Sequence, residues 1–178
     1  MSDTTENAAA NVHPAPALAH LLLHCEPHRA EEIGTRAGLR LPEGMLDSAT
    51  TEGWSALHLA PDEWLLIGAA DGASAMTAAL ADAEGNAPLS LVDISDRFLA
   101  WDVSGPRVED LLAAGCPMDL ALASFPVGRC TRTLFGKATV TLWRTGDETF
   151  RLEVARSFGP YVEALLARAL VERVNPRA

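Results

Sequence analysis

Three histidines at four-residue intervals and a neighbouring cysteine are the best candidate metal ligands in the chain: His20, His24, Cys25 and His28. On an uninterrupted helix the three imidazoles would share one face, which is metal-ligand spacing. Pro27 argues against that helix, because proline lacks the amide hydrogen and its ring clashes with the preceding turn. We therefore expect a segment at the edge of the core without a metal site, and keep a metal-binding regulatory module as an alternative.

Nucleophilic and nucleotide chemistry have no recognisable motif in the sequence. Neither a G-x-S-x-G elbow nor the loops G-x-G-x-x-G and G-x-x-x-x-G-K-[ST] occur. Ser104 directly precedes Gly105-Pro106, and capping of a helix explains it. Asp93 lies among apolar residues at the end of an expected strand, so we expect it to form a structural ion pair with Arg97 or to cap a turn. We predict no catalytic residue and no cofactor-binding residue in this chain.

Charge is distributed unevenly along the chain, whose formal net charge is -10. Residues 1–128 hold 5 arginines and 19 acidic side chains, whereas residues 129–178 hold 8 arginines, Lys137 and 5 acidic side chains. So acidic a chain is repelled by nucleic acid and by anionic membranes, and we expect neither as a partner. The basic end is a candidate protein interface, unless its arginines pair with acids of the same fold. The arginines concerned are Arg129, Arg132, Arg144, Arg151 and Arg156.

Composition indicates a globular cytoplasmic protein. Hydrophobic residues make up 48% and charged residues 21% of the chain, and no apolar run approaches the roughly 20 residues needed to cross a bilayer. The three cysteines are far apart and form no C-x-x-C pair, which is typical of free thiols in a reducing compartment.

The hydrophobic periodicity predicts an α+β fold. Alternating or continuous apolar runs predict strands at 54–60, 64–67, 89–94, 98–103, 130–135, 138–143 and 150–154. Helices are expected after residues 71, 104 and 157, and residues 116–128 read as a contact loop. Hairpins interrupted by helices favour antiparallel or mixed sheets with helices packed on one face. We predict a disordered tail at 1–17 and an α+β domain at 18–174, built either as one unit or as two pseudo-repeated halves.

Several segments resemble known proteins. The stretch Val92-Asp93-Ile94-Ser95, followed by Val103-Ser104-Gly105-Pro106 and Leu111-Leu112, is similar to the folate-binding fold of aminomethyltransferases. With four further segments added, the chain resembles the gamma subunit family of heterotetrameric sarcosine oxidases over roughly residues 54 to 170. These segments are Pro61 to Leu66, Gly115 to Leu120, Gly128 to Thr133 and Phe150 to Phe158.

The resemblance implies a non-catalytic structural subunit. Its complex would oxidatively demethylate sarcosine to glycine and pass the one-carbon unit to tetrahydrofolate, with FAD, FMN, NAD and zinc held by other chains. The implied partners are a larger alpha subunit and the beta and delta subunits. The G-G-x-x-D-D segment of working aminomethyltransferases is missing, and residues 134–139 stand near where it would fall. A stand-alone folate-binding or one-carbon transfer protein remains the alternative that the resembled fold permits.

Overall fold

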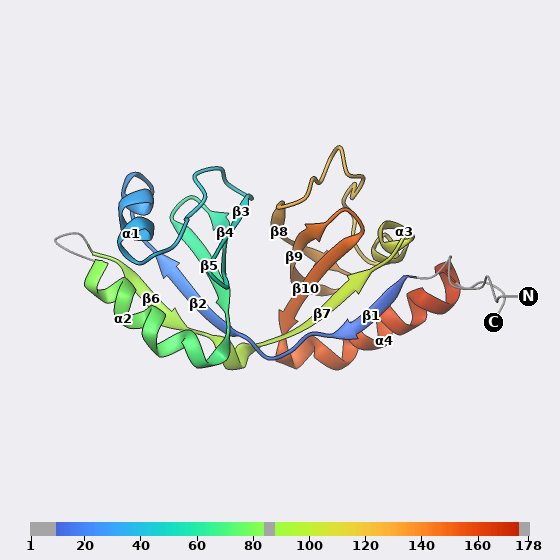
Figure 1. The fold of residues 1–178 in the computed structure, drawn as a ribbon. Helices are drawn as coiled ribbons and strands as arrows, with labels where there is room; N and C mark the ends of the chain where they lie inside the picture. Colours follow the sequence, from blue (N-terminus) through green and yellow to red (C-terminus); the bar gives the residue numbers. More distant parts are fainter. Residues whose placement is uncertain (1–9, 84–87, 175–178) are drawn as a thin grey trace, which may run out of the picture. The chain divides into compact units, whose positions relative to one another are not determined.

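The computed structural model describes residues 10–83 and 88–174, and these form two compact units. The continuous unit comprises Ala17–Arg97. The split unit combines the segment up to Pro16 with the chain from Phe98 onward. Each unit contains a five-stranded antiparallel sheet with helices on one face, as Figure 1 shows, so the predicted α+β class is confirmed.

The sheet of the continuous unit has the strand order β3-β4-β5-β2-β6. Its strands are β2 (Ala19–His24), β3 (Ser48–Thr51), β4 (Trp54–Ala60), β5 (Glu63–Gly68) and β6 (Ser90–Asp93). Its helices are η1 (Pro27–Arg29), α1 (Ala30–Arg36), η2 (Ala70–Gly72), α2 (Ala73–Ala83) and η3 (Ser95–Arg97). The β4–β5 hairpin turns at Pro61-Asp62, as the sequence predicts.

The core of the continuous unit lies between its sheet and the helices α1 and α2. Alternate residues of β2, among them Leu21 and Leu23, point into this core because successive strand side chains face opposite sides of a sheet. Ile33 of α1 and Leu80 of α2 meet them and are fully buried. Each such side chain contributes about 1.5–3 kcal/mol to folding.

The sheet of the split unit has the strand order β1-β7-β10-β9-β8. Its strands are β1 (Asn11–Pro14), β7 (Phe98–Ser104), β8 (Cys130–Phe135), β9 (Ala138–Gly146) and β10 (Thr149–Ala155). Its helices are α3 (Val108–Leu112), η4 (Arg156–Phe158), α4 (Gly159–Ala169) and the π-helical η5 (Leu170–Val174). Pro160 occupies the first turn of α4, where its missing amide hydrogen removes no helical bond.

The core of the split unit packs one sheet face against α3 and α4. Trp101 and Val103 of β7 are buried there, and Leu152 of β10 pairs directly with Trp101. Val162 and Leu166 of α4 complete the layer from the helix side. The alternation seen in the sequence therefore has the correct phase in β7: Trp101 and Val103 are buried, whereas Asp102 between them is exposed.

The strand β1 corrects the prediction that residues 1–17 form a disordered tail. Val12 pairs with Val103, and the Ala15 amide donates to the Ala100 carbonyl at 2.9 Å. Ala10 is buried in the core of the split unit. Residues 1–9, the rest of the predicted tail, lie outside the described residues. The strand escaped prediction because Val12 is the only large apolar side chain within Asn11–Pro14.

The two units share one strand order. In the continuous unit β2 is followed by a helix, three antiparallel strands and a second helix, and β6 completes the sheet beside β2. In the split unit β7 is followed by the same series, but the strand beside it is β1, which comes from the start of the chain. The sheet of each unit is therefore completed by a strand from a different point of the sequence.

Candidate functional site

Arg144 places a charged side chain at the end of the buried face of β9. Ala138, Val140 and Leu142 occupy alternate positions of this strand and belong to the core of the split unit. The same alternation carries Arg144 inward, and only 1% of it is exposed. A guanidinium in the interior requires partners within the fold, because an unpaired buried charge is strongly destabilising.

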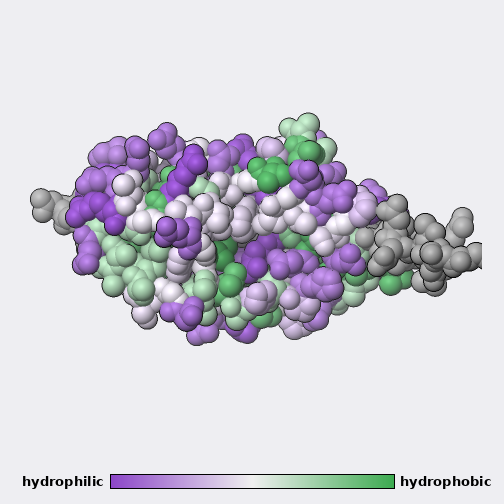
Figure 2. Space-filling model, viewed as in Figure 1, coloured by the Kyte–Doolittle hydropathy of each residue, from purple (hydrophilic) through white to green (hydrophobic). Residues whose placement is uncertain are grey.

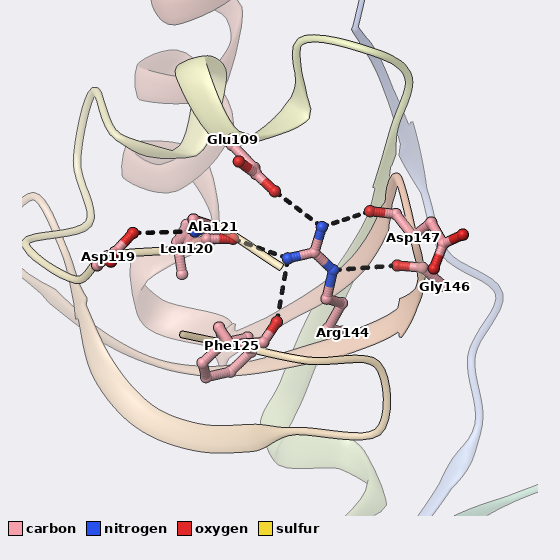
Figure 3. Close-up of polar contacts among 8 residues, drawn as sticks. All are labelled: Glu109, Asp119, Leu120, Ala121, Phe125, Arg144, Gly146 and Asp147. Atoms are coloured by element: carbon pink, nitrogen blue, oxygen red, sulfur yellow. Dashed lines mark hydrogen bonds and ion pairs between the residues drawn. The ribbon is translucent and has the colours of Figure 1, made fainter. Parts of the chain in front are cut away.

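All five N–H donors of the Arg144 guanidinium have acceptors, as Figure 3 shows. Nη1 donates to the carbonyls of Leu120 at 2.7 Å and Phe125 at 3.0 Å. Nη2 donates to Glu109 Oε1 at 2.8 Å and to the Asp147 carbonyl. Nε donates to the Gly146 carbonyl at 3.3 Å. The guanidinium carbon also lies 4.7 Å from the centroid of the Phe150 ring. One side chain thereby connects α3, the β9–β10 turn and the loop before β8.

The loop before β8, residues 116–128, is held in place at both ends of its tip, and we call it the anchored loop. Leu120 and Phe125 are buried in the core of the split unit, and their carbonyls are the two that bind Arg144 Nη1. The Gly128 amide donates to the Arg144 carbonyl at 2.9 Å. Side-chain burial and backbone hydrogen bonds together therefore fix the conformation of this loop.

Asp119 caps the turn at the tip of the anchored loop. Its Oδ1 accepts a hydrogen bond from the Ala121 amide at 3.0 Å, and its Oδ2 accepts one from Ser124 Oγ at 2.6 Å. The bond from Ser124, and then that from Ala121, hold the pKa of Asp119 below its ordinary value. The capped turn is thus organised around an ionised carboxylate at neutral pH.

The tip of the anchored loop exposes apolar side chains. Leu122 is 45% and Val127 48% exposed, and residues 120–128 contain no charged side chain in a chain of net charge -10. Figure 2 shows hydrophobic residues at the tip of this loop, which Figure 1 draws above the sheet of the split unit. A rigid, uncharged and exposed loop is suited to contact another protein, because little conformational entropy is lost on binding.

The structure divides the five arginines that the sequence suggested as a partner interface. Arg144 is buried with its partners inside the fold. Arg151 is also buried, with Nε 2.7 Å from Glu153 Oε1 and Nη1 3.5 Å from Asp102 Oδ1. These two arginines serve ion pairs of their own unit and do not reach outward. Of the other three, Arg132 and Arg156 are exposed and Arg129 is half-buried.

Asp93 caps a turn and does not pair with Arg97. Its Oδ1 accepts hydrogen bonds from Ser95 Oγ at 2.6 Å and from the Ser95 amide at 2.9 Å. These two bonds lower the pKa of Asp93, that of the Ser95 hydroxyl most. Within the described residues no ion pair joins Asp93 to Arg97, because the adjacent Ser95 satisfies the carboxylate locally.

The histidines that could have formed a metal site lie on different elements. His20 and His24 belong to the strand β2, where His20 is buried, and His28 lies in η1 beyond Pro27. No cluster of three metal-ligating side chains occurs within residues 10–83 and 88–174. Burial raises the pKa of the neighbouring Cys25 thiol to about 11, partly offset by Arg29.

Membrane-spanning helices are a further class of functional element. Within residues 10–83 and 88–174, no helix is both long and apolar enough to span a membrane.

Comparison with known proteins places these features in a family. The model of the "Sarcosine oxidase, gamma subunit family" matches residues 24–172. Sarcosine oxidase subunit gamma of Corynebacterium sp. (strain P-1) is 34% identical over 80% of this chain and 68% of the relative. The subunit gamma of Arthrobacter sp. is 31% identical over 81% of this chain and 70% of the relative.

Solved structures agree with this family. A chain of the heterotetrameric sarcosine oxidase from Corynebacterium sp. U-96 in complex with pyrrole 2-carboxylate superposes with a TM-score of 0.84 and 26% identity, covering 94% of this chain and 87% of that one. Aminomethyltransferase T of the glycine cleavage system from Bartonella henselae has a TM-score of 0.66 at 15% identity over 90% of this chain and 46% of that one, a likeness of fold alone. The chain therefore belongs to the sarcosine oxidase gamma subunit family.

Proposed function

We propose that this chain is a structural subunit of a cytoplasmic heterotetrameric sarcosine oxidase complex and docks onto a larger partner chain through the tip of the anchored loop. The observation that carries the proposal is that the buried Arg144, whose five donors are all engaged, uses two of them to hold a loop whose exposed tip is uncharged. A fold that buries a charge to rigidify an exposed apolar loop presents a pre-organised contact surface.

The likeness to a chain of a heterotetrameric sarcosine oxidase supports assembly with other subunits. In the proposed complex the larger alpha subunit would receive the loop, and the beta and delta subunits would complete the assembly. The complex would demethylate sarcosine to glycine and transfer the one-carbon unit to tetrahydrofolate. FAD, FMN, NAD and zinc would belong to the other chains, and this chain would contribute no catalytic residue.

The exposed Arg132 would assist docking at the rim of the loop contact. It lies near the start of the edge strand β8, which follows the anchored loop, whereas Arg156 follows β10 at the end opposite the Phe150–Arg144 pair. An exposed guanidinium can bind a carboxylate of a partner with two parallel hydrogen bonds. The contribution of Arg132 would be to orientation and association rate, because charges at the rim of an interface add little affinity.

The test is co-purification of a tagged chain from cells that also produce the alpha, beta and delta subunits. The wild type should retain two larger flavin-containing chains and a small zinc-binding chain. Leu122→Asp and Val127→Asp should reduce recovery of the alpha subunit at least tenfold, because a carboxylate would be desolvated in an apolar contact. Met45→Asp, at an equally exposed methionine of the continuous unit, is the matched control.

The outcomes separate assembly from folding. Unchanged recovery with both loop variants would refute the loop as the contact surface, whereas a wild type that retains no partner would refute the subunit role itself. Melting curves of the free variants should match the wild type, since the replaced side chains are exposed. Saturable binding of tetrahydrofolate by the isolated chain would favour a stand-alone one-carbon protein.

A further inference from the structure

The strand β1 pairs with a strand that is far from it in the sequence. Its residues Asn11 to Pro14 lie beside Ser104 to Trp101 of β7, at one edge of the sheet of the split unit, as Figure 1 shows. The whole continuous unit intervenes between the two strands in the chain. Residues 15–18 connect β1 to β2 and form neither helix nor strand. Noncovalent contacts alone therefore hold β1 in its sheet.

The split unit keeps nearly all of its core without β1. Within residues 10–83 and 88–174, Ala10 is the only buried member of that core that precedes Phe98, and Val12 packs against it from a partly buried position. The other strands of the sheet and the helices α3 and α4 all begin at Phe98 or later. Release of β1 therefore removes one small side chain and part of another from the core, and the remaining layer can stay folded.

Release of β1 would leave the edge of β7 without partners. The Ala15 amide donates to the Ala100 carbonyl at 2.9 Å, and β1 continues the pairing as far as Ser104. A strand edge with free N–H and C=O groups is a template for another strand. The sequence that fits this edge is Asn11 to Pro14, since it occupies the edge here, and a second copy of the chain carries the same sequence.

Two prolines keep β1 extended. Pro14 is the last residue of the strand and Pro16 lies in the connection to β2. Each proline fixes its own φ at about −65° and disfavours the helical conformation at the preceding residue. A released β1 therefore keeps much of the shape of a strand. It loses little conformational entropy when it pairs again, in its own sheet or in that of another copy.

We propose that two copies of this chain form a dimer by exchanging β1, so that the strand of each copy pairs with β7 of the other. The dimer repeats every contact that β1 makes in the monomer and leaves no strand edge newly unpaired. Each copy gives one strand and receives one, so the arrangement is closed and symmetric. The proposal concerns the chain without its partner subunits and is independent of docking through the anchored loop.

The experiment mixes two full-length variants, Val12→Cys and Val103→Cys. The two positions face each other in β1 and β7, and the alternation from the bonded Ala15–Ala100 pair leaves them without direct hydrogen bonds. The Cα atoms of such a pair are about 4.5 Å apart, a distance that a disulfide can bridge. Incubation of the mixture at high concentration, followed by oxidation, should give a covalent heterodimer on a non-reducing gel, because exchange brings the two cysteines together.

Two further mixtures complete the experiment. Val154→Cys in place of Val103→Cys is the matched control, because Val154 is equally buried but lies on β10, which does not pair with β1. It should give no covalent heterodimer. Asn11→Cys with Ser104→Cys repeats the test at a second pair, where neither side chain is buried and folding is not at risk.

The wild type provides an independent measurement. While the monomer predominates, a tenfold higher chain concentration should raise the ratio of dimer to monomer about tenfold in size-exclusion chromatography with light scattering. Three results would overturn the proposal: no covalent heterodimer with either pair of variants, an equal yield with Val154→Cys, or a wild type that is monomeric at every concentration. Melting curves report the folding of each variant. Because these measurements use the chain alone, their failure would leave the co-purification experiment unaffected, and the reverse also holds.

Discussion

Replacement of Arg144 by methionine should loosen the anchored loop and destabilise the split unit. Methionine keeps the length of the side chain and its contact with Phe150 but removes all five donors. Four backbone carbonyls lose a hydrogen bond, each worth about 1 kcal/mol net. The four bonds together therefore contribute about 4 kcal/mol, which agrees with the roughly 3–5 kcal/mol that breaking a buried charged network typically costs. For a chain of this size the melting temperature should fall by roughly 6–20 °C.

The assay combines urea unfolding with limited proteolysis. Arg132→Met is the matched control, because the same change at an exposed position of β8 should alter the free energy of unfolding by less than about 1 kcal/mol. Protease should cut Arg144→Met within residues 121–127 under conditions that leave the control intact. Equal stability of the two variants together with equal resistance of the loop would refute the role given to Arg144.

Three further predictions concern single side chains. Val12→Asp should lower the free energy of unfolding by about 1–3 kcal/mol, since Val12 packs against the core of the split unit, whereas His13→Asp on the exposed side of β1 should be near neutral; equal effects would place β1 elsewhere. The pKa of Asp119 is lowered in the folded chain. Its cap therefore stabilises the loop fully above about pH 3.9, the pKa of an aspartate in an unfolded chain, and this stabilisation is lost as the pH falls through the lower pKa of the folded state. Pepsin cleavage of the anchored loop should therefore increase below about pH 4 in the wild type, and Asp119→Asn should show no such step. With its pKa raised to about 11, the Cys25 thiol stays protonated at neutral pH, so iodoacetamide should label it slowly until urea is added; fast labelling of the folded chain would contradict its burial.

Most sheet elements could be predicted because their side chains alternate. The runs at Cys130–Phe135, Ala138–Gly146 and Thr149–Ala155 have a period of two and are joined by short turns. Each of these strands can therefore be identified from its own sequence. The strand Asn11–Pro14 could not be found in this way. It pairs with residues far along the chain and buries little apolar surface of its own.

The anchored loop could be located but its anchor could not. Two prolines and several small residues mark 116–128 as irregular. Arg144 continues the inward phase of Ala138, Val140 and Leu142, a signal that was present in the sequence and pointed to the interior. Arg144 was nevertheless among the five candidate interface arginines, and it is buried because backbone carbonyls of a distant loop supply the acceptors. Such acceptors cannot be read from residue types.

The place of β1 in the chain has a consequence for synthesis on the ribosome. Asn11 must wait for Ser104 before it can pair, and at a rate of roughly 5–20 residues per second this delay lasts about 5–20 s. The continuous unit lies wholly within that interval, so it can fold while the N-terminal segment is still unpaired. Slowed elongation within Ala17–Arg97 would lengthen the time for which an unpartnered strand is available to neighbouring nascent chains. Codon choice in that stretch should therefore influence aggregation of the newly made protein more than codon choice after residue 104.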